Sequence, residues 1–195
     1  MSVPAMRAAL AAAALGALLA MDGCVPVMVA GGIAVGATVA TDRRSTGTQV
    51  DDEVIEDKAS FAIQEKYKSD VHVDITSFNG IVLLTGEVPS EQVRTDVEQI
   101  VRSNPKVRAV QDELVVGKVT DLGSRSNDSV ITSKVKARFV ETNKFQINHV
   151  KVVTERGVVY LMGMVTRDEG NAAAQIASTT EGVQRVVKVF EYTSG

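Results

Sequence analysis

The chain has 195 residues, of which 45% are hydrophobic and 23% are charged. This composition is typical of a globular protein with one or two small domains, and it excludes a disordered chain. The formal net charge of −3 argues against a protein that neutralises a nucleic-acid backbone, so we expect no nucleic-acid partner. The single cysteine, Cys24, excludes an internal disulfide and a cysteine-rich zinc site.

The first 23 residues have the order of a secretory signal peptide. Arg7 precedes an apolar run of mostly Ala and Leu over residues 8–21, and Gly23 and Cys24 follow it. The run is shorter than the roughly 20 apolar residues that a transmembrane helix needs. We therefore expect residues 1–23 to be removed.

The residues before Cys24 resemble the lipobox of bacterial lipoproteins, in which a small residue precedes an acylated cysteine. Gly23 and Cys24 match this pattern, whereas Met21 and Asp22 stand where an aliphatic and a small residue are usual. The resemblance implies that Cys24 is the lipid anchor. Because Val25 rather than Asp follows the cysteine, the resemblance also implies an outer-membrane protein that faces the periplasm.

Residues 24–49 are expected to form an apolar tether beside the lipid. Gly31, Gly32 and Gly36, in the apolar part of this segment, each weaken a helix by about 1 kcal/mol relative to alanine. Two other interpretations stay open: a glycine-patterned helix that lies on the membrane, and an uncleaved hairpin that crosses it. Arg43 and Arg44 stand near the end of the tether, where they could meet lipid head groups.

The rest of the chain repeats one pattern at an offset of about 76 to 77 residues, which is long for a solenoid and suits two small domains. Each copy reads helix, strand, strand, helix, strand. We predict an α+β fold of two tandem αββαβ modules, each a small mixed sheet packed by two helices. Module 1 is expected at residues 50–117, a linker at 118–126 and module 2 at 127–195.

Apolar residues at helical spacing predict the buried face of each helix. The first helices carry the stripes Ile55, Ala59, Ile63 and Ile131, Val135, Phe139. The second helices, near residues 90–103 and 167–178, carry Val93, Val97, Ile100, Val101 and Ala172, Ala173, Ile176. We expect Asn127 or Asp128 to cap the first helix of module 2, and the acidic residues 51–57 to form a solvated helix amino terminus.

Four glycines fall at matching places in the two copies. Asn79-Gly80 predicts a tight hairpin between the first two strands, and Arg156-Gly157 is a weaker form of the same turn. Gly86 and Gly163 stand at the ends of the second strands, where glycine marks a bulge or a close backbone approach. We interpret all four as structural, because no phosphate-loop spacing surrounds them.

This order of elements, the four glycines, the Val-x-x-Val closures at Val107 and Val183, and the stretch 41–52 resemble dual BON-domain outer-membrane lipoproteins over nearly the whole chain. The resemblance implies a role in maintaining the outer membrane. It also implies that the first helix of module 2 binds anionic phospholipid, with Val130 at the position of a tryptophan that inserts into lipid.

The sequence carries no recognised catalytic motif, so we expect neither an enzyme nor a cofactor. His72 and His149 fall at equivalent places ahead of Val73 and Val150. If Val73 faces the core, strand alternation turns His72 outward, and we expect no metal or catalytic role for either histidine.

Charge differs between the copies. Residues 51–117 hold 7 basic and 14 acidic residues, a net of −7, whereas residues 127–195 hold 9 basic and 7 acidic, a net of +2. An anionic bilayer should therefore attract only module 2. We hypothesise that Val130, Ser133, Lys134 and Arg138 bind anionic phospholipid. The alternative is an adaptor for the outer-membrane assembly machinery, which would dock on the acidic face of module 1 or on an exposed sheet edge.

Overall fold

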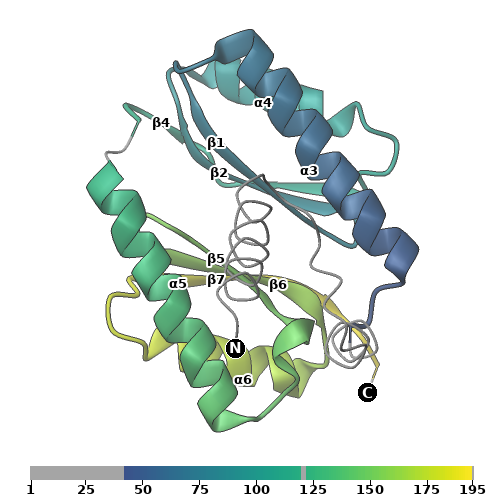
Figure 1. The fold of residues 1–195 in the computed structure, drawn as a ribbon, viewed down its shortest axis with the longest axis vertical. Coiled ribbons are helices and arrows are strands. Elements are labelled where there is room, and N and C mark those ends of the chain that lie inside the picture. Colours follow the sequence, from purple (N-terminus) through teal and green to yellow (C-terminus); the bar gives the residue numbers. More distant parts are fainter. Residues whose placement is uncertain (1–41, 120–121, 195) are drawn as a thin grey trace, which may run out of the picture. The chain divides into compact units, whose positions relative to one another are not determined.

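The computed structural model describes residues 42–119 and 122–194, which form two consecutive modules (Figure 1). Module 1 contains α3 (Thr46–Tyr67), β1 (His72–Phe78), β2 (Ile81–Val88), α4 (Glu91–Arg102), β3 (Ala109–Asp112) and β4 (Val115–Val116). Module 2 contains α5 (Leu122–Thr142), the short 3-10 helix η2 (Ile147–His149), β5 (Lys151–Glu155), β6 (Val158–Val165), α6 (Arg167–Ser178) and β7 (Arg185–Tyr192). The predicted αββαβ plan is confirmed in both copies. The expected signal peptide, the anchor Cys24 and the tether as far as residue 41 lie outside the described residues.

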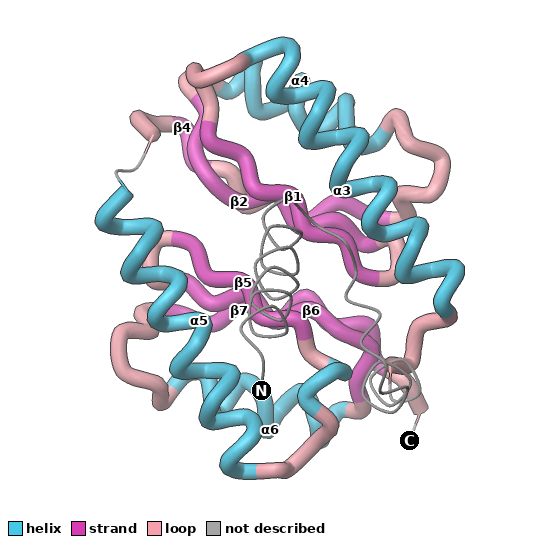
Figure 2. Tube along the Cα trace, viewed as in Figure 1, coloured by secondary structure: helices cyan, strands magenta, loops and turns pink. Residues whose placement is uncertain are grey.

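Each module has a mixed sheet with its second strand in the centre. In module 1, β2 pairs antiparallel with β1 and parallel with β3 and β4. In module 2, β6 pairs antiparallel with β5 and parallel with β7. Figure 2 shows the helices of each module lying against its own sheet. Parallel pairing requires a crossover connection, and α4 and α6 supply it.

Both predicted hairpins are present. Asn79 and Gly80 have φ angles of 54° and 72°, and Arg156 and Gly157 have φ angles of 52° and 73°. Two consecutive residues with positive φ are what a type I′ turn requires, and its twist matches that of the flanking strands. Both turns place a non-glycine residue in the left-handed region, and asparagine adopts that region more readily than arginine, which explains why Arg156-Gly157 is the weaker sequence signal.

The predicted helix faces form the cores of the two modules. The buried stripes are Ile55, Ala59, Ile63 and Ile131, Val135, Phe139. Val97 and Val101 of α4 and Ala173 and Ile176 of α6 are buried as well, and they pack against their own sheet. Each module thus has a separate core between its helices and one face of its sheet.

The first helix of each module begins earlier than the apolar pattern predicts. The Ser45 side chain accepts a hydrogen bond from the Thr48 backbone N–H and caps α3, so residues 46–49 of the expected tether are helical. Helix α5 begins at Leu122, inside the expected linker, so the prediction that Asn127 or Asp128 caps it was wrong. The apolar periodicity identifies only the helical turns that pack against the core. Both helices begin before those turns.

The sheet faces opposite the helices are also apolar, and they form a third core cluster with residues from both modules. Phe78 and Leu83 of module 1 lie in this cluster with Tyr160 and Met162 of module 2. The two modules belong to one compact unit of the chain. Both faces of β2 and β6 are therefore buried. Among the described residues, none of the helices is long and apolar enough to cross a membrane.

Candidate functional site

The outward face of α5 carries exposed apolar side chains at helical spacing. Val130 is 52% exposed and Val140 is 63% exposed, and the exposed Ser133 and Ala137 lie between them on the same face. Sequence reasoning selected Val130 and Ser133 but missed Val140. The missed signal was the spacing i, i+3, i+7, i+10 from Val130, which mirrors the buried stripe on the opposite side.

Lysines flank this apolar face. Lys134, Lys136 and Lys144 are all exposed on α5 or just after it. The Lys134 ammonium donates to the exposed Glu181 carboxylate at 2.9 Å, and this hydrogen bond lowers the pKa of Glu181. A surface pair of this kind is weak, so Lys134 can exchange Glu181 for another anion at little cost.

Arg138 lies apart from the other predicted lipid-binding residues. Its Nη1 donates to the Ile176 carbonyl oxygen at 3.0 Å and to the Thr180 hydroxyl at 2.9 Å. Both partners lie in or just after α6, so Arg138 fastens α5 to α6 beside the exposed face. The structure thus gathers Val130, Ser133 and Lys134 on one surface and turns the Arg138 guanidinium toward α6.

Arg43 and Arg44 bind carboxylates of the protein, contrary to the expectation that they meet lipid. Arg43 pairs with Glu169 at 2.6 Å. Arg44 pairs with Asp42 and Asp52, both at 2.9 Å. The segment before α3 is therefore fixed to both modules by ion pairs.

Asp52 and Asp128 hold the two hairpins, which corrects the interpretation of the acidic run as a solvated helix end. Asp52 is buried and accepts hydrogen bonds from the backbone N–H groups of Asn79 and Gly80 at 2.7 and 2.8 Å. Asp128 is buried too and accepts from Arg156 N and Gly157 N, both at 2.8 Å. The signal for this role was the recurrence of Asp ahead of Val-Ile in both copies.

The remaining predicted glycines lie where the second strand passes very close to the histidine that begins or precedes the first strand. Gly86 has φ +112° and Gly163 has φ +155°. A Cβ at Gly86 would overlap the His72 carbonyl oxygen, and one at Gly163 would overlap the same atom of His149. The two histidines are thus equivalent in backbone position.

The side chains of the two histidines have different surroundings. His149 is buried, and its Nδ1 lies 3.3 Å from Glu169 Oε1. Partial burial alone would raise the pKa of Glu169, but hydrogen bonds from Arg43, the Thr166 backbone and His149 outweigh it and lower the pKa to about 2. His72 points away from its own core, as expected, but Glu155 of module 2 lies 3.9 Å from its Nε2.

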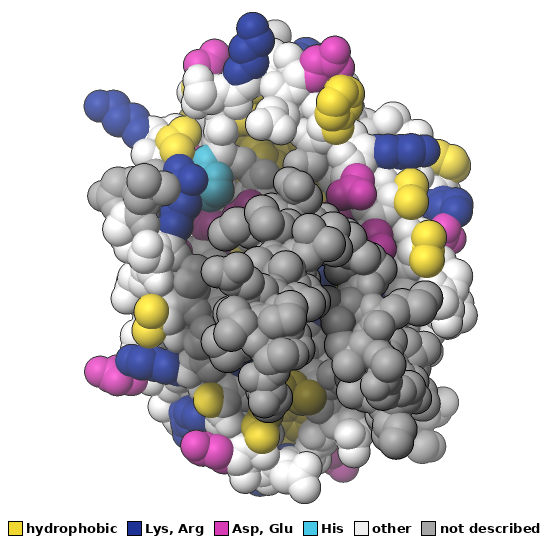
Figure 3. Space-filling model, viewed as in Figure 1, with side chains coloured by type: hydrophobic (Ala, Val, Ile, Leu, Met, Phe, Trp, Pro, Cys, Tyr) yellow, Lys and Arg dark blue, Asp and Glu magenta, His cyan; other side chains and the backbone are white. Residues whose placement is uncertain are grey.

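Some charged residues of the two modules form ion pairs with each other and are therefore not available to bind a membrane. Glu56 of module 1 pairs with Lys151 of module 2 at 2.9 Å, and Arg108 pairs with Glu191 at 2.9 Å. On the face shown in Figure 3, basic and acidic side chains lie interspersed.

Comparison with known proteins agrees with this architecture. The model of the BON domain family matches residues 51–118 and 127–194. The chain is 41% identical to the outer membrane lipoprotein DolP of Haemophilus influenzae, over 91% of this chain and 93% of that protein. It is 32% identical to a 21 kDa hemolysin of Actinobacillus pleuropneumoniae, over 77% of this chain and 79% of that protein.

Among solved structures, CdsD, a structural protein of the type III secretion system of Chlamydia trachomatis, aligns with a TM-score of 0.30 and 11% identity. That alignment covers 74% of this chain and 64% of the other. The family assignment rests on the two domain matches and on the identity to DolP. The chain belongs to the BON domain family, with two BON domains in tandem.

Proposed function

We propose that this protein is a non-catalytic lipoprotein that binds anionic phospholipid through α5 of module 2 and thereby supports the integrity of the envelope. The localisation, lipid-anchored in the outer membrane, follows from the similarity to the outer membrane lipoprotein DolP. The observation that carries the binding proposal is the exposed Val130–Val140 face with lysines beside it.

The energies of the α5 face suit a reversible contact with a membrane. Burial of a valine side chain contributes about 1.5 kcal/mol or more, and each basic group near an anionic surface contributes about 1 kcal/mol. Two valines and three lysines thus supply a few kcal/mol, which is modest for a free protein. A lipid anchor at Cys24 would hold α5 at a high effective concentration near the bilayer, so a modest affinity suffices.

The absence of tryptophan from the chain allows a direct test, because a single introduced tryptophan reports only on its own surroundings. The full chain is reconstituted into vesicles as the Val130→Trp or the Val140→Trp variant, with Phe61→Trp on α3 of module 1 as the matched control. Phe61 is 69% exposed, so all three positions start in water. We expect a blue shift of the emission at positions 130 and 140 in vesicles that contain phosphatidylglycerol, and none at position 61.

Charge reversal separates specific binding from simple proximity to the bilayer. Lys134→Glu, Lys136→Glu and Lys144→Glu together should abolish the blue shift, because each reversal replaces an attraction of about 1 kcal/mol with a repulsion. High salt should reduce the shift as well. An equal shift at position 61, or a shift of the same size in pure phosphatidylcholine, would overturn the proposal.

The exposed Phe61 favours a second candidate function, that of an adaptor for another envelope protein. Phe61 and Val50 are both more than half exposed on α3. A photo-crosslinking residue at position 61 should then yield one discrete protein adduct in cells, while the same residue at position 140 yields lipid adducts. Asp52 is unsuitable for charge reversal in such a test, because it is buried beneath the hairpin.

A further inference from the structure

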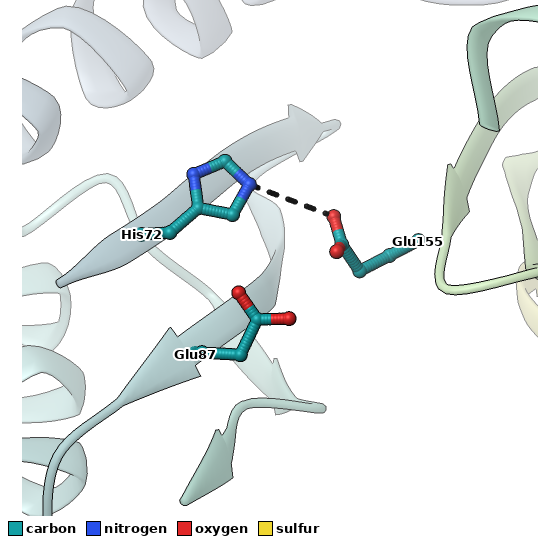
Figure 4. A group of neighbouring side chains, drawn as sticks. All are labelled: His72, Glu87 and Glu155. Atoms are coloured by element: carbon teal, nitrogen blue, oxygen red, sulfur yellow. Dashed lines mark ion pairs between the residues drawn. The ribbon is translucent and has the colours of Figure 1, made fainter. Parts of the chain in front are cut away.

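Three ligand-type side chains from the two modules meet on the sheet faces that lie opposite the helices. His72 on β1 and Glu87 on β2 are cross-strand partners in module 1, and Glu155 at the end of β5 belongs to module 2. One potential donor atom from each of the three lies within 4.8 Å of the other two. Figure 4 shows the imidazole and the two carboxyl groups turned toward a common point.

The two glutamates of the cluster are buried, and the cluster contains two buried atoms that lack a hydrogen-bond partner within the described part of the chain. Glu87 has no exposed surface and Glu155 is 7% exposed. Among the described residues, neither Glu155 Oε1 nor His72 Nε2 has a hydrogen-bond partner. A buried carboxylate oxygen without a partner is costly, because nothing replaces the water that it loses. The site therefore calls for a positively charged partner.

Electrostatics lead to the same requirement. Glu87 and Glu155 bring two carboxyl groups into one buried space, and Asp74 and the basic Arg125 lie at the cleft beside them. Arg156 Nη1 lies 3.9 Å from Glu87 Oε1. Two carboxylates and an imidazole thus share a space in which a cation would relieve their mutual repulsion.

The two modules are copies of one pattern, so each residue of the cluster has an equivalent residue at the other end of the contact between the two sheets. The alignment of the two hairpins makes His149, Lys151 and Met164 the equivalents of His72, Asp74 and Glu87. Phe78 is the equivalent of Glu155, and it lies with Met164 in the apolar cluster between the sheets. Glu87 and Glu155 therefore have no acidic counterparts at the equivalent positions, so the shared backbone does not require them.

We propose that His72, Glu87 and Glu155 bind one divalent transition-metal ion, for which Zn²⁺ is the test case, and that this ion joins the two modules. Asp74 supplies a fourth oxygen at the open side, where its Oδ2 lies 3.7 Å from His72 Nε2. A cleft of about 280 Å³ gives access from solvent, and its lining includes the basic Arg125 together with His72, Asp74 and Glu155. This inference goes beyond the proposed lipid binding and does not depend on it.

The donor set selects the class of ion. Imidazole nitrogen with carboxylate oxygens suits Zn²⁺ and its first-row neighbours, whereas Mg²⁺ and Ca²⁺ prefer oxygen ligands alone. A tetrahedral ion with bonds of about 2 Å holds its donors roughly 3.3 Å apart, so binding must draw the side chains inward by up to about 1.5 Å. Rotation of the glutamate side chains can supply a movement of that size. Because the ligands come from both modules, the bound ion would resist their separation.

The experiment measures Zn²⁺ binding to the untagged full chain in detergent by titration calorimetry after treatment with a chelator. All samples carry Cys24→Ser, because the only thiol in the chain would compete for zinc. We expect one Zn²⁺ per chain and no comparable binding of Mg²⁺. Glu155→Gln and His72→Gln should each weaken binding at least about tenfold, since even the loss of groups behind the ligands commonly costs 10- to 100-fold.

The controls use the equivalent histidine and another carboxylate that joins the modules. His149→Gln and Glu191→Gln should bind Zn²⁺ as the parent does. Thermal unfolding tests the folding of the variants: Zn²⁺ should raise the midpoint of the parent, whereas Glu155→Gln should fold in chelator and gain nothing from Zn²⁺. Undiminished binding by Glu155→Gln and His72→Gln, an equal loss in His149→Gln, or no binding by the parent would overturn the proposal.

Discussion

Asp52 and Asp128 act at a distance that no local sequence pattern reveals. Each stands on the first helix of its module and accepts hydrogen bonds from a turn 27 to 29 residues further along the chain. Sequence patterns identified the turn and the helix face correctly, because both depend on neighbouring residues. They could not connect the aspartate to the turn, because that connection exists only after the helix has packed on the sheet.

Loss of the Asp52 carboxylate should therefore destabilise the protein more than its place in an acidic run suggests. Asp52→Ala leaves the buried N–H groups of Asn79 and Gly80 without an acceptor, and we expect the free energy of unfolding to fall by about 3 kcal/mol. Urea denaturation measures this change. Asp51→Ala is the matched control, because Asp51 is 41% exposed in its side chain and should matter by less than about 0.5 kcal/mol. Equal losses would show that the acidic charge on this part of α3, rather than the turn, explains the effect.

The close approach at Gly163 gives a second prediction at the scale of one residue. Gly163→Ala places a Cβ against the His149 carbonyl oxygen in a backbone region that side chains rarely adopt. We expect a loss of about 3 kcal/mol or more in unfolding free energy, or failure to fold. Gly47→Ala, on a helix where the added Cβ meets only ordinary contacts, should be neutral or stabilising in the same assay.

At the scale of elements, the order of helices and strands could be predicted because their apolar periods differ. The boundaries of α3 and α5 could not, because residues 46–49 and 123–127, in the early turns of these helices, are small or polar and carry no apolar spacing. The candidate site shows the same limit. The outer face of α5 was only partly predicted. In the sequence, the exposed Val130 and Val140 look the same as a buried valine, and only the packed structure shows which side of the helix faces solvent.

Substitution of Arg138 can show whether this residue contributes mainly to the stability of the protein or to lipid binding. Arg138→Ala removes two hydrogen bonds to the end of α6, so we expect the free energy of unfolding to fall by about 1 to 2 kcal/mol. In the Val140→Trp reporter, Arg138→Ala should reduce the blue shift less than Lys134→Glu does. Chemical denaturation and vesicle fluorescence measure the two effects. If Arg138→Ala reduced the blue shift more than Lys134→Glu and left stability unchanged, Arg138 would instead belong to the lipid-binding residues.

At the scale of the whole molecule, the contact between the two sheets joins the modules. A signal for it was present in the sequence, because β2 begins with the unbroken apolar run 81–84 and β6 with the run 158–162. Unbroken runs of this kind, in contrast to alternating ones, mark strands that are buried on both faces. The sequence could not say what covers the second face. The His72–Glu87–Glu155 cluster was missed for the same reason, since Glu155 comes from the other module.

Disruption of the sheet-to-sheet contact should uncouple the modules. Met162 is buried between the sheets, and Met162→Asp would place an unpaired charge there, which is costly. We expect the single cooperative transition in calorimetry to split into two, since each module keeps its own core. Val140→Asp, at an exposed site, should leave one transition. A single transition at lower temperature for Met162→Asp would indicate that neither module is stable alone.

Acid should weaken the link between the segment before α3 and module 2. The pKa of Glu169 is about 2 in the folded protein and near 4.5 when unfolded, so its ion pair stabilises the fold above pH 4.5, and this contribution is lost as the pH falls toward 2. Glu169→Gln should cost about 1 to 2 kcal/mol at pH 7, after allowance for the partial exposure of the pair, and progressively less below pH 4.5. Denaturation at several pH values measures this, with Asp168→Asn as the control.

The unequal ends of the contact between the sheets have an evolutionary consequence. If two separate copies of one module associated in this way, every substitution would appear at both ends, and a carboxylate placed opposite His72 would be matched by one opposite His149. In a fused pair, each copy is encoded separately. One end could therefore acquire Glu155 while the other kept Phe78. Duplication within one gene thus allows a symmetric scaffold to carry a single asymmetric feature.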